Sequence, residues 1–199
     1  MRTQTKETQQ NITPKIAHEI LVNGNKRFVQ NLRSMRNLQD QVIATSEGQY
    51  PFAVVLSCID SRVPAELVFD QGIGDIFSVR VAGNVVNEDI LGSIEYGCKV
   101  AGSKIVVVLG HTKCGAVTAA CKQVELGNIT ALLSKIQPAV QQIDQEKTNA
   151  IEETSIVNVA HSIERIRNES PILADMEKNG EIEIVGASYD VSTGIVQFL

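Results

Sequence analysis

The stretch Phe52-Ala-Val-Val-Leu-Ser-Cys-Ile-Asp-Ser-Arg-Val-Pro64 decides the fold. Its first five residues, 52–56, are apolar without alternation, which is typical of a parallel strand that is buried on both faces. Cys58, Asp60 and Arg62 follow at every second position, so they share one side as long as the chain stays extended. Open α/β sheets bind their ligands at the C-terminal ends of strands. This edge is therefore a candidate functional site.

A second candidate half-site follows another apolar run. Lys104-Ile-Val-Val-Val-Leu109 predicts a strand, and His111-Thr-Lys-Cys114 comes directly after it. If this strand pairs in parallel with the first, His111 and Cys114 lie close to Cys58. Two thiolates and an imidazole are ligands that Zn²⁺ favours, and three protein ligands leave a fourth position open, as in catalytic sites.

Each of these three residues, taken alone, fits a core position as well as a ligand position. Cys98 and Cys121 are predicted to be small apolar core residues. His18 and His161 are predicted to be surface or packing residues.

The remaining pattern alternates strands and helices, which predicts a three-layer α/β fold with a mostly parallel central sheet of four to five strands. Further strands are expected at 75–81 and 181–189, with a short antiparallel edge strand at 195–198. Helices are expected at 87–100, 116–125, 130–145 and 152–167, and a loop at 38–51. We expect residues 1–13 to be a flexible N-terminus and residues 14–199 to be a single domain that begins with a helical arm at 14–37.

Composition narrows the class of protein. The 199 residues carry a net charge of −5 and no basic stripe, which argues against nucleic acid as a partner. No apolar run is long enough to span a bilayer, and the first residues lack the apolar core of a secretory signal. A cytoplasmic location is therefore predicted. In that reducing compartment, the 4 cysteines suggest metal binding or catalysis rather than disulfides.

The chain resembles the β-class carbonic anhydrases. The Cys-x-Asp-Ser-Arg signature of that family stands here as Cys58-Ile-Asp-Ser-Arg62, and its His-x-x-Cys-Gly signature as His111-Thr-Lys-Cys-Gly115. The similarity continues through Arg80-Val-Ala-Gly-Asn84 and Gly186-Ala-Ser-Tyr-Asp190, and it covers most of residues 14–199.

The resemblance implies an enzyme that reversibly hydrates carbon dioxide to bicarbonate and a proton. It implies one Zn²⁺ per chain, held by Cys58, His111 and Cys114, with a zinc-bound hydroxide that attacks CO₂ beside an Asp60–Arg62 dyad. Asp60 would become a metal ligand only if the site closes. The family also implies a homodimer, or a tetramer built from two dimers. The lack of a membrane-spanning apolar run predicts that no membrane is a partner.

Five further residues are assigned to substrate binding by the same resemblance. Gln49, Phe77 and Tyr96 stand where the open, plant-like members carry these residue types, and Phe77 and Tyr96 would reach the pocket across a dimer interface. Gly83 and Gly115 would let the backbone approach the substrate closely. Without the family, Gln49, Phe77 and Tyr96 fit a loop glutamine, a strand-core phenylalanine and a helix-packing tyrosine.

Three other functions stay open. A hydrolase of COS or CS₂ would use the same scaffold and metal ligands. A zinc-stabilised interaction module is disfavoured because the site has only three strong ligands and an ionic dyad at the open position. A cysteine-based redox enzyme would need neither His111 nor Asp60.

Overall fold

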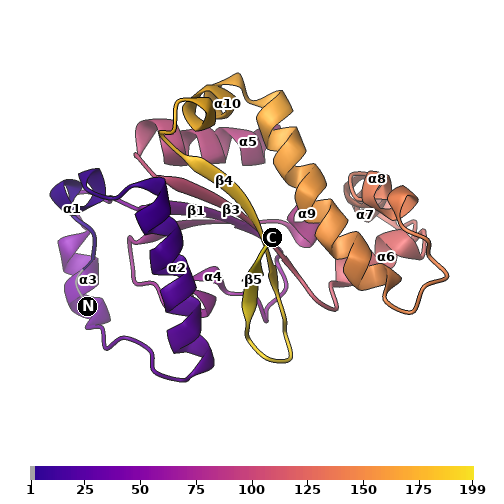
Figure 1. The fold of residues 1–199 in the computed structure, drawn as a ribbon, viewed down its shortest axis with the longest axis horizontal. Coiled ribbons are helices and arrows are strands. Elements are labelled where there is room, and N and C mark those ends of the chain that lie inside the picture. Colours follow the sequence, from indigo (N-terminus) through magenta and orange to yellow (C-terminus); the bar gives the residue numbers. More distant parts are fainter. Residues whose placement is uncertain (1–2) are drawn as a thin grey trace.

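A five-stranded sheet forms the centre of the computed structural model, which describes residues 3–199 (Figure 1). The strand order is β2-β1-β3-β4-β5. The first four strands are parallel and β5 is antiparallel to β4. The strands span β1 Ala53–Ser57, β2 Ile76–Arg80, β3 Ile105–His111, β4 Glu183–Tyr189 and β5 Val196–Phe198. This confirms the predicted mostly parallel sheet with an antiparallel edge strand.

Helices cover both faces of the sheet, which confirms the three layers (Figure 1). Every residue of β1 and β3 is buried, because alternate side chains enter opposite cores. Val55 and Val107 pack toward α2 and α4, whereas Val54 and Val106 pack toward α5, α9 and α10. These helices span α2 Pro14–Val29, α4 Ala65–Val68, α5 Glu88–Glu95, α9 Ala150–Glu169 and α10 Pro171–Lys178. A π-helical turn, η2 Tyr96–Val100, continues α5 within the predicted helix at 87–100.

A third apolar cluster lies beyond the C-terminal end of the sheet. It contains Val117 and Ile136 together with Cys58 and Cys114. Its helices are α6 Gly115–Cys121, α7 Gly127–Leu133 and α8 Gln137–Gln142. The helix predicted at 130–145 is thus divided in two, because Pro138 has no backbone N–H to donate and is accommodated in the first turn of α8. The predicted helix at 116–125 ends early, at Cys121.

The N-terminal region is more ordered than its polar sequence suggests. Within the predicted flexible segment 1–13, of which residues 1–2 lie outside the described part, the structure has a helix, α1 Lys6–Gln10. The buried Gln9 amide fixes this helix by donating to the carbonyls of Pro51 and Ala101, at 2.7 and 2.8 Å. A further helix, α3 Leu38–Ala44, lies in the predicted loop at 38–51.

The predicted arm at 14–37 is helical only as far as Val29. Asn31 has a positive φ of 55°, which ends the helical path. Among the helices that the structure describes, none is long and apolar enough to cross a membrane.

A buried ion cluster ties the segment after α2 to the end of α4. The Asp70 carboxylate, whose side chain is 1% exposed, accepts hydrogen bonds from Arg27 Nε at 2.6 Å and Arg36 Nη1 at 2.5 Å. The backbone N–H and hydroxyl of Ser34 also donate to it. Burial alone would raise the pKa of Asp70, but these donors outweigh it and lower the pKa to about 2.

Asp70→Asn is expected to destabilise the fold by about 3 kcal/mol at neutral pH, because two arginines lose their anionic partner. The pKa of Asp70 is lower in the folded chain than the roughly 3.9 of an unfolded aspartate. Its contribution is therefore present above pH ~4 and is lost as the pH falls toward 2. Urea unfolding across this range measures both effects, with the exposed Asp175→Asn as control. An unfolding midpoint for Asp70→Asn that equals that of the control would contradict this role.

Candidate metal centre

Cys58, His111 and Cys114 come together at the C-terminal edge of the sheet. β1 and β3 pair in parallel with Ser57 opposite Leu109, so Cys58 and His111 leave adjacent strands side by side. Cys114 follows three residues later, immediately before α6. The ligand atoms of the three side chains all lie within 4.8 Å of one another, and all three residues are buried. The predicted proximity of the two strand ends is confirmed.

The His111 ring is oriented for metal binding. Its Nδ1 lies 2.9 Å from the carbonyl oxygen of Thr112. A carbonyl can only accept, so Nδ1 carries the proton and Nε2 keeps its lone pair. This Nε2 is buried and has no hydrogen-bond partner among the described residues. A buried polar atom without a hydrogen bond destabilises the fold. The position of Nε2 beside two thiols therefore indicates that this nitrogen is a metal ligand.

The two thiols interact directly. The hydrogen bond with Cys114 holds the pKa of Cys58 well below its usual value in spite of burial, with a smaller contribution from the Gly83 N–H. The same contact, together with burial, raises the pKa of Cys114. A divalent cation would favour the thiolate form of both. The donor set of two sulfurs and one nitrogen therefore fits Zn²⁺.

Gly83 supports the Cys58 sulfur. Its N–H donates to Cys58 Sγ at 3.3 Å. Its φ is +68°, and a Cβ atom there would lie 2.6 Å from the Ile136 side chain. Glycine therefore suits both the backbone conformation and the limited space. Gly115, in contrast, is exposed, and a Cβ atom added to it would meet nothing within 4 Å.

Asp60 and Arg62 form a bidentate ion pair. Arg62 Nε donates to Asp60 Oδ1 at 2.9 Å and Arg62 Nη2 to Asp60 Oδ2 at 2.6 Å. The chain does not stay extended after Cys58, so the condition for a shared side is not met; a turn at 61–62 folds Arg62 back onto the carboxylate. The Arg62 side chain is the main cause of a pKa of about 2 for Asp60. Asp60 is therefore held as a carboxylate in a fixed orientation.

Several residues that sequence reasoning missed fix the backbone of the site. Arg80, at the end of β2, donates to the carbonyls of Cys58 at 3.0 Å and Asp60 at 2.7 Å. On α9, Ser155 donates to the carbonyl of His111 and Asn158 to that of Gly83. The polar residues at 155, 158 and 162 recur at helical spacing, so they share one face of α9. This spacing is the sequence pattern that could have indicated their role.

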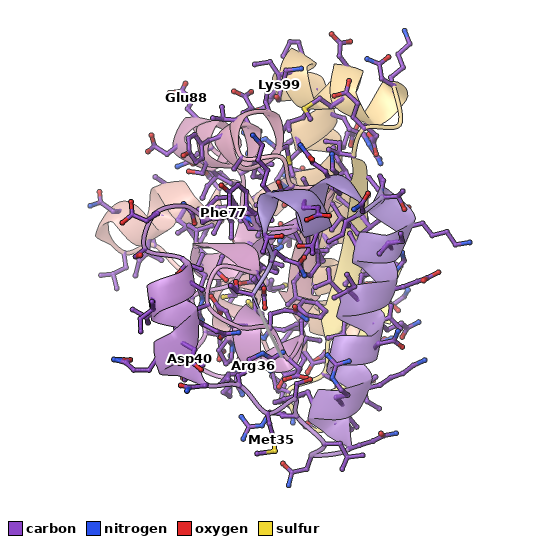
Figure 2. All side chains as sticks on the ribbon, turned by 90° about the vertical axis from the view of Figure 1, so that its left-hand side faces the viewer. Met35, Arg36, Asp40, Phe77, Glu88 and Lys99 are labelled. Carbon is purple, nitrogen blue, oxygen red and sulfur yellow. The ribbon has the colours of Figure 1, made fainter. Side chains whose placement is uncertain are left out.

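Gln49, Phe77 and Tyr96 lie at the other end of β1. Phe77 is opposite Val54, near the start of the strand, whereas Cys58 follows its end. The rings of Phe77 and Tyr96 pack edge to face with centroids 6.2 Å apart, and Gln49 and Tyr96 line one surface pocket. Figure 2 looks at the side of the molecule that carries Phe77, with Glu88 and Lys99 above it and Asp40 and Arg36 below. The structure thus gathers Gln49, Phe77 and Tyr96 apart from Cys58, His111 and Cys114 of the same chain.

Comparison with known proteins agrees with this geometry. A model of the carbonic anhydrase family matches residues 53–196. Carbonic anhydrase 2 of Mycobacterium tuberculosis is 35% identical over 191 residues, covering 92% of each chain. The carbonic anhydrase of Mycolicibacterium smegmatis is 34% identical and covers 94% of each. The solved structure of the β-carbonic anhydrase CafA of Aspergillus fumigatus superposes with a TM-score of 0.71 at 27% identity, covering 81% of each chain.

Proposed function

This chain belongs to the β-class carbonic anhydrases, and from that premise we propose that Cys58, His111 and Cys114 hold a catalytic zinc ion beside an Asp60–Arg62 dyad. The reaction is the reversible hydration of CO₂ to bicarbonate and a proton. The observation that carries the proposal is the buried, unpartnered Nε2 of His111, which lies with two thiol sulfurs. A structural zinc site would have four protein ligands, whereas this one has three.

When bound, zinc supplies the Lewis acidity that makes water a nucleophile near neutral pH. Asp60 remains a carboxylate because Arg62 holds both of its oxygens. It can therefore accept a hydrogen bond from the attacking water and fix the direction of its lone pair toward CO₂. The same pairing keeps Asp60 from becoming a fourth ligand, which is the open form of the site. The buried Cys58, Val85 and Cys114 side chains belong to one apolar cluster.

We also propose that the active enzyme is a homodimer with shared sites. The family resemblance assigns Phe77 and Tyr96 to the site of a partner chain. The position of Phe77 opposite Val54, near the start of β1, and the packing of Tyr96 against it support this assignment. Tyr96 is 53% exposed, which leaves it free to reach a partner chain. β2, which carries Phe77, is the outermost strand on its side of the described sheet. Gln49 would donate to a bicarbonate oxygen, and exposed Gly115 would allow close approach of the substrate.

A stopped-flow CO₂ hydration assay tests the proposed activity. The purified chain is expected to hydrate CO₂, to lose this activity with a zinc chelator and to regain it with Zn²⁺. Two thiolate ligands donate more charge than histidines would, so the rate is expected to rise toward alkaline pH. COS is assayed in parallel as the alternative substrate. A zinc-replete chain that hydrolyses COS but does not hydrate CO₂ would overturn the proposal.

A further inference from the structure

Thr112 connects the metal ligand His111 to the last turn of the chain. Its carbonyl accepts the Nδ1 proton of His111 at 2.9 Å. Its hydroxyl accepts a hydrogen bond from the backbone N–H of Val191 at 3.1 Å and lies 3.5 Å from Asp190 Oδ1. Its own N–H donates to the carbonyl of Tyr189 at 3.0 Å. One residue therefore orients the histidine on one side and bonds to the terminal turn on the other.

Lys113, the next residue, touches the dyad. Its carbonyl accepts a hydrogen bond from Arg62 Nη2 at 3.2 Å, the same nitrogen that holds Asp60. Lys113 has a φ of +55°, a conformation that costs about 1 kcal/mol or more for a residue with a side chain. Its Nζ donates to Ser192 Oγ, also in the terminal turn, at 3.1 Å. The strained loop at 112–113 must therefore be held by its neighbours, and its described hydrogen bonds to them include those to the terminal turn.

The turn at 190–194 is well suited to hold this loop, because it is itself fixed. The Asp190 carboxylate accepts from the Ser192 N–H at 2.7 Å and the Thr193 hydroxyl at 3.0 Å. On its other side, the Asn25 side chain of α2 donates to the carbonyl of Gly194 at 2.9 Å. Asn25 also accepts from the N–H of Val196 at 2.9 Å. The turn is thus anchored between α2 and the loop of the metal site.

We propose that Thr112 is a positioning residue of the active site. The hydrogen bonds of its hydroxyl to the terminal turn at 190–194 fix the positions of two carbonyl groups. The first is the Thr112 carbonyl that orients His111, and the second is the Lys113 carbonyl that helps to hold Arg62. This inference rests on the proposed function, because it gives a catalytic role to the hydrogen bond between the Lys113 carbonyl and Arg62. It also assigns a function to the C-terminal hairpin, which lies outside both signature motifs.

Thr112→Val and Thr112→Ser form the matched pair that tests the hydroxyl. Valine keeps the shape and loses the hydroxyl, whereas serine keeps the hydroxyl. Thr112→Val is expected to lower kcat about 10-fold and to weaken zinc binding about 10-fold, the lower end for residues that orient a metal ligand. KM should change less than about twofold, because Thr112 acts on the catalytic groups and not on substrate binding. Thr112→Ser should retain wild-type kcat and zinc affinity within about twofold.

Zinc affinity is measured by competition with a chelator, and this measurement does not depend on catalytic activity. If the wild-type chain binds zinc but does not hydrate CO₂, the proposed function fails, and the zinc affinities of the pair still test the role of Thr112. Wild-type kcat and zinc affinity in Thr112→Val would overturn the inference, as would equal losses in Thr112→Ser. If Thr112→Val does not fold, Asp190→Ala replaces it, since it loosens the turn and leaves the hydroxyl in place. Wild-type kcat and zinc affinity in that variant would also overturn the inference.

Discussion

Cys58→Ser is expected to leave the protein folded, without zinc and without measurable CO₂ hydration. Cys58 lies in the third apolar cluster and its sulfur contacts Cys114, His111 and the Gly83 N–H. A serine hydroxyl is nearly the size of the thiol, but it does not become an anion at neutral pH and is a poor zinc ligand. Two strong ligands would remain, too few for a stable catalytic site. We expect the same loss for Cys114→Ser.

Metal analysis after dialysis, followed by the hydration assay, measures both parts of this prediction. Cys121→Ser is the matched control, because Cys121 is only partly buried and lies outside the ligand set. It should keep one zinc ion per chain and full activity. Cys98 is less suitable, since its deep burial raises the pKa of the thiol to about 12 and any polar replacement there would disturb the core. A full zinc complement in Cys58→Ser would remove that residue from the ligand set.

The sheet and the proximity of Cys58, His111 and Cys114 were predictable because their signals are local. An unbroken apolar run such as 52–56 has few stable solutions besides a buried strand, and the parallel order follows from the intervening helices. Once β1 and β3 pair in parallel, Cys58 and His111 must lie close together. The motif spacing then adds Cys114.

The features that were missed depend on contacts between distant segments. α1 is only 5 residues long, and isolated helices of that length are unstable. It forms because buried Gln9 reaches the carbonyls of Pro51 and Ala101, which no local pattern reveals. Arg80 likewise looks like an ordinary arginine at a strand end, and only the sheet order places it beside Cys58 and Asp60.

The proposed role of Phe77 and Tyr96 in the site of a partner chain could not be predicted from the residue pattern, for a different reason. Their side chains pack on each other in the structure, as a strand residue and a helix residue would in any fold. Phe77 lies opposite Val54, near the start of β1, whereas Cys58 follows the end of that strand. The family resemblance, rather than the residue pattern, is what assigns them to a partner.

Arg62→Ala is expected to lower CO₂ hydration by roughly 10²-fold or more while zinc stays bound, which separates its effect from that of the cysteine variants. Asp60 then loses both of its side-chain hydrogen bonds from Arg62, at 2.9 and 2.6 Å, and its carboxylate is free to turn onto the metal. The backbone should stay in place, because Arg80 holds the carbonyl of Asp60 independently. The ligand set does not include Arg62, so zinc content should not change.

The Asp60→Ala and Asp60→Ala/Arg62→Ala variants show whether Arg62 works through the carboxylate. If the role of Arg62 is to orient and restrain Asp60, the double variant should be no slower than Asp60→Ala. Once the carboxylate is gone, removing Arg62 has no further effect on the rate. Arg62→Lys should recover only part of the activity, since an ammonium group keeps the charge but cannot hold both oxygens in a planar fork. Losses that multiply in the double variant would instead mean that Arg62 acts on the substrate directly. A zinc-replete Arg62→Ala enzyme with normal turnover would contradict the proposed role of Arg62.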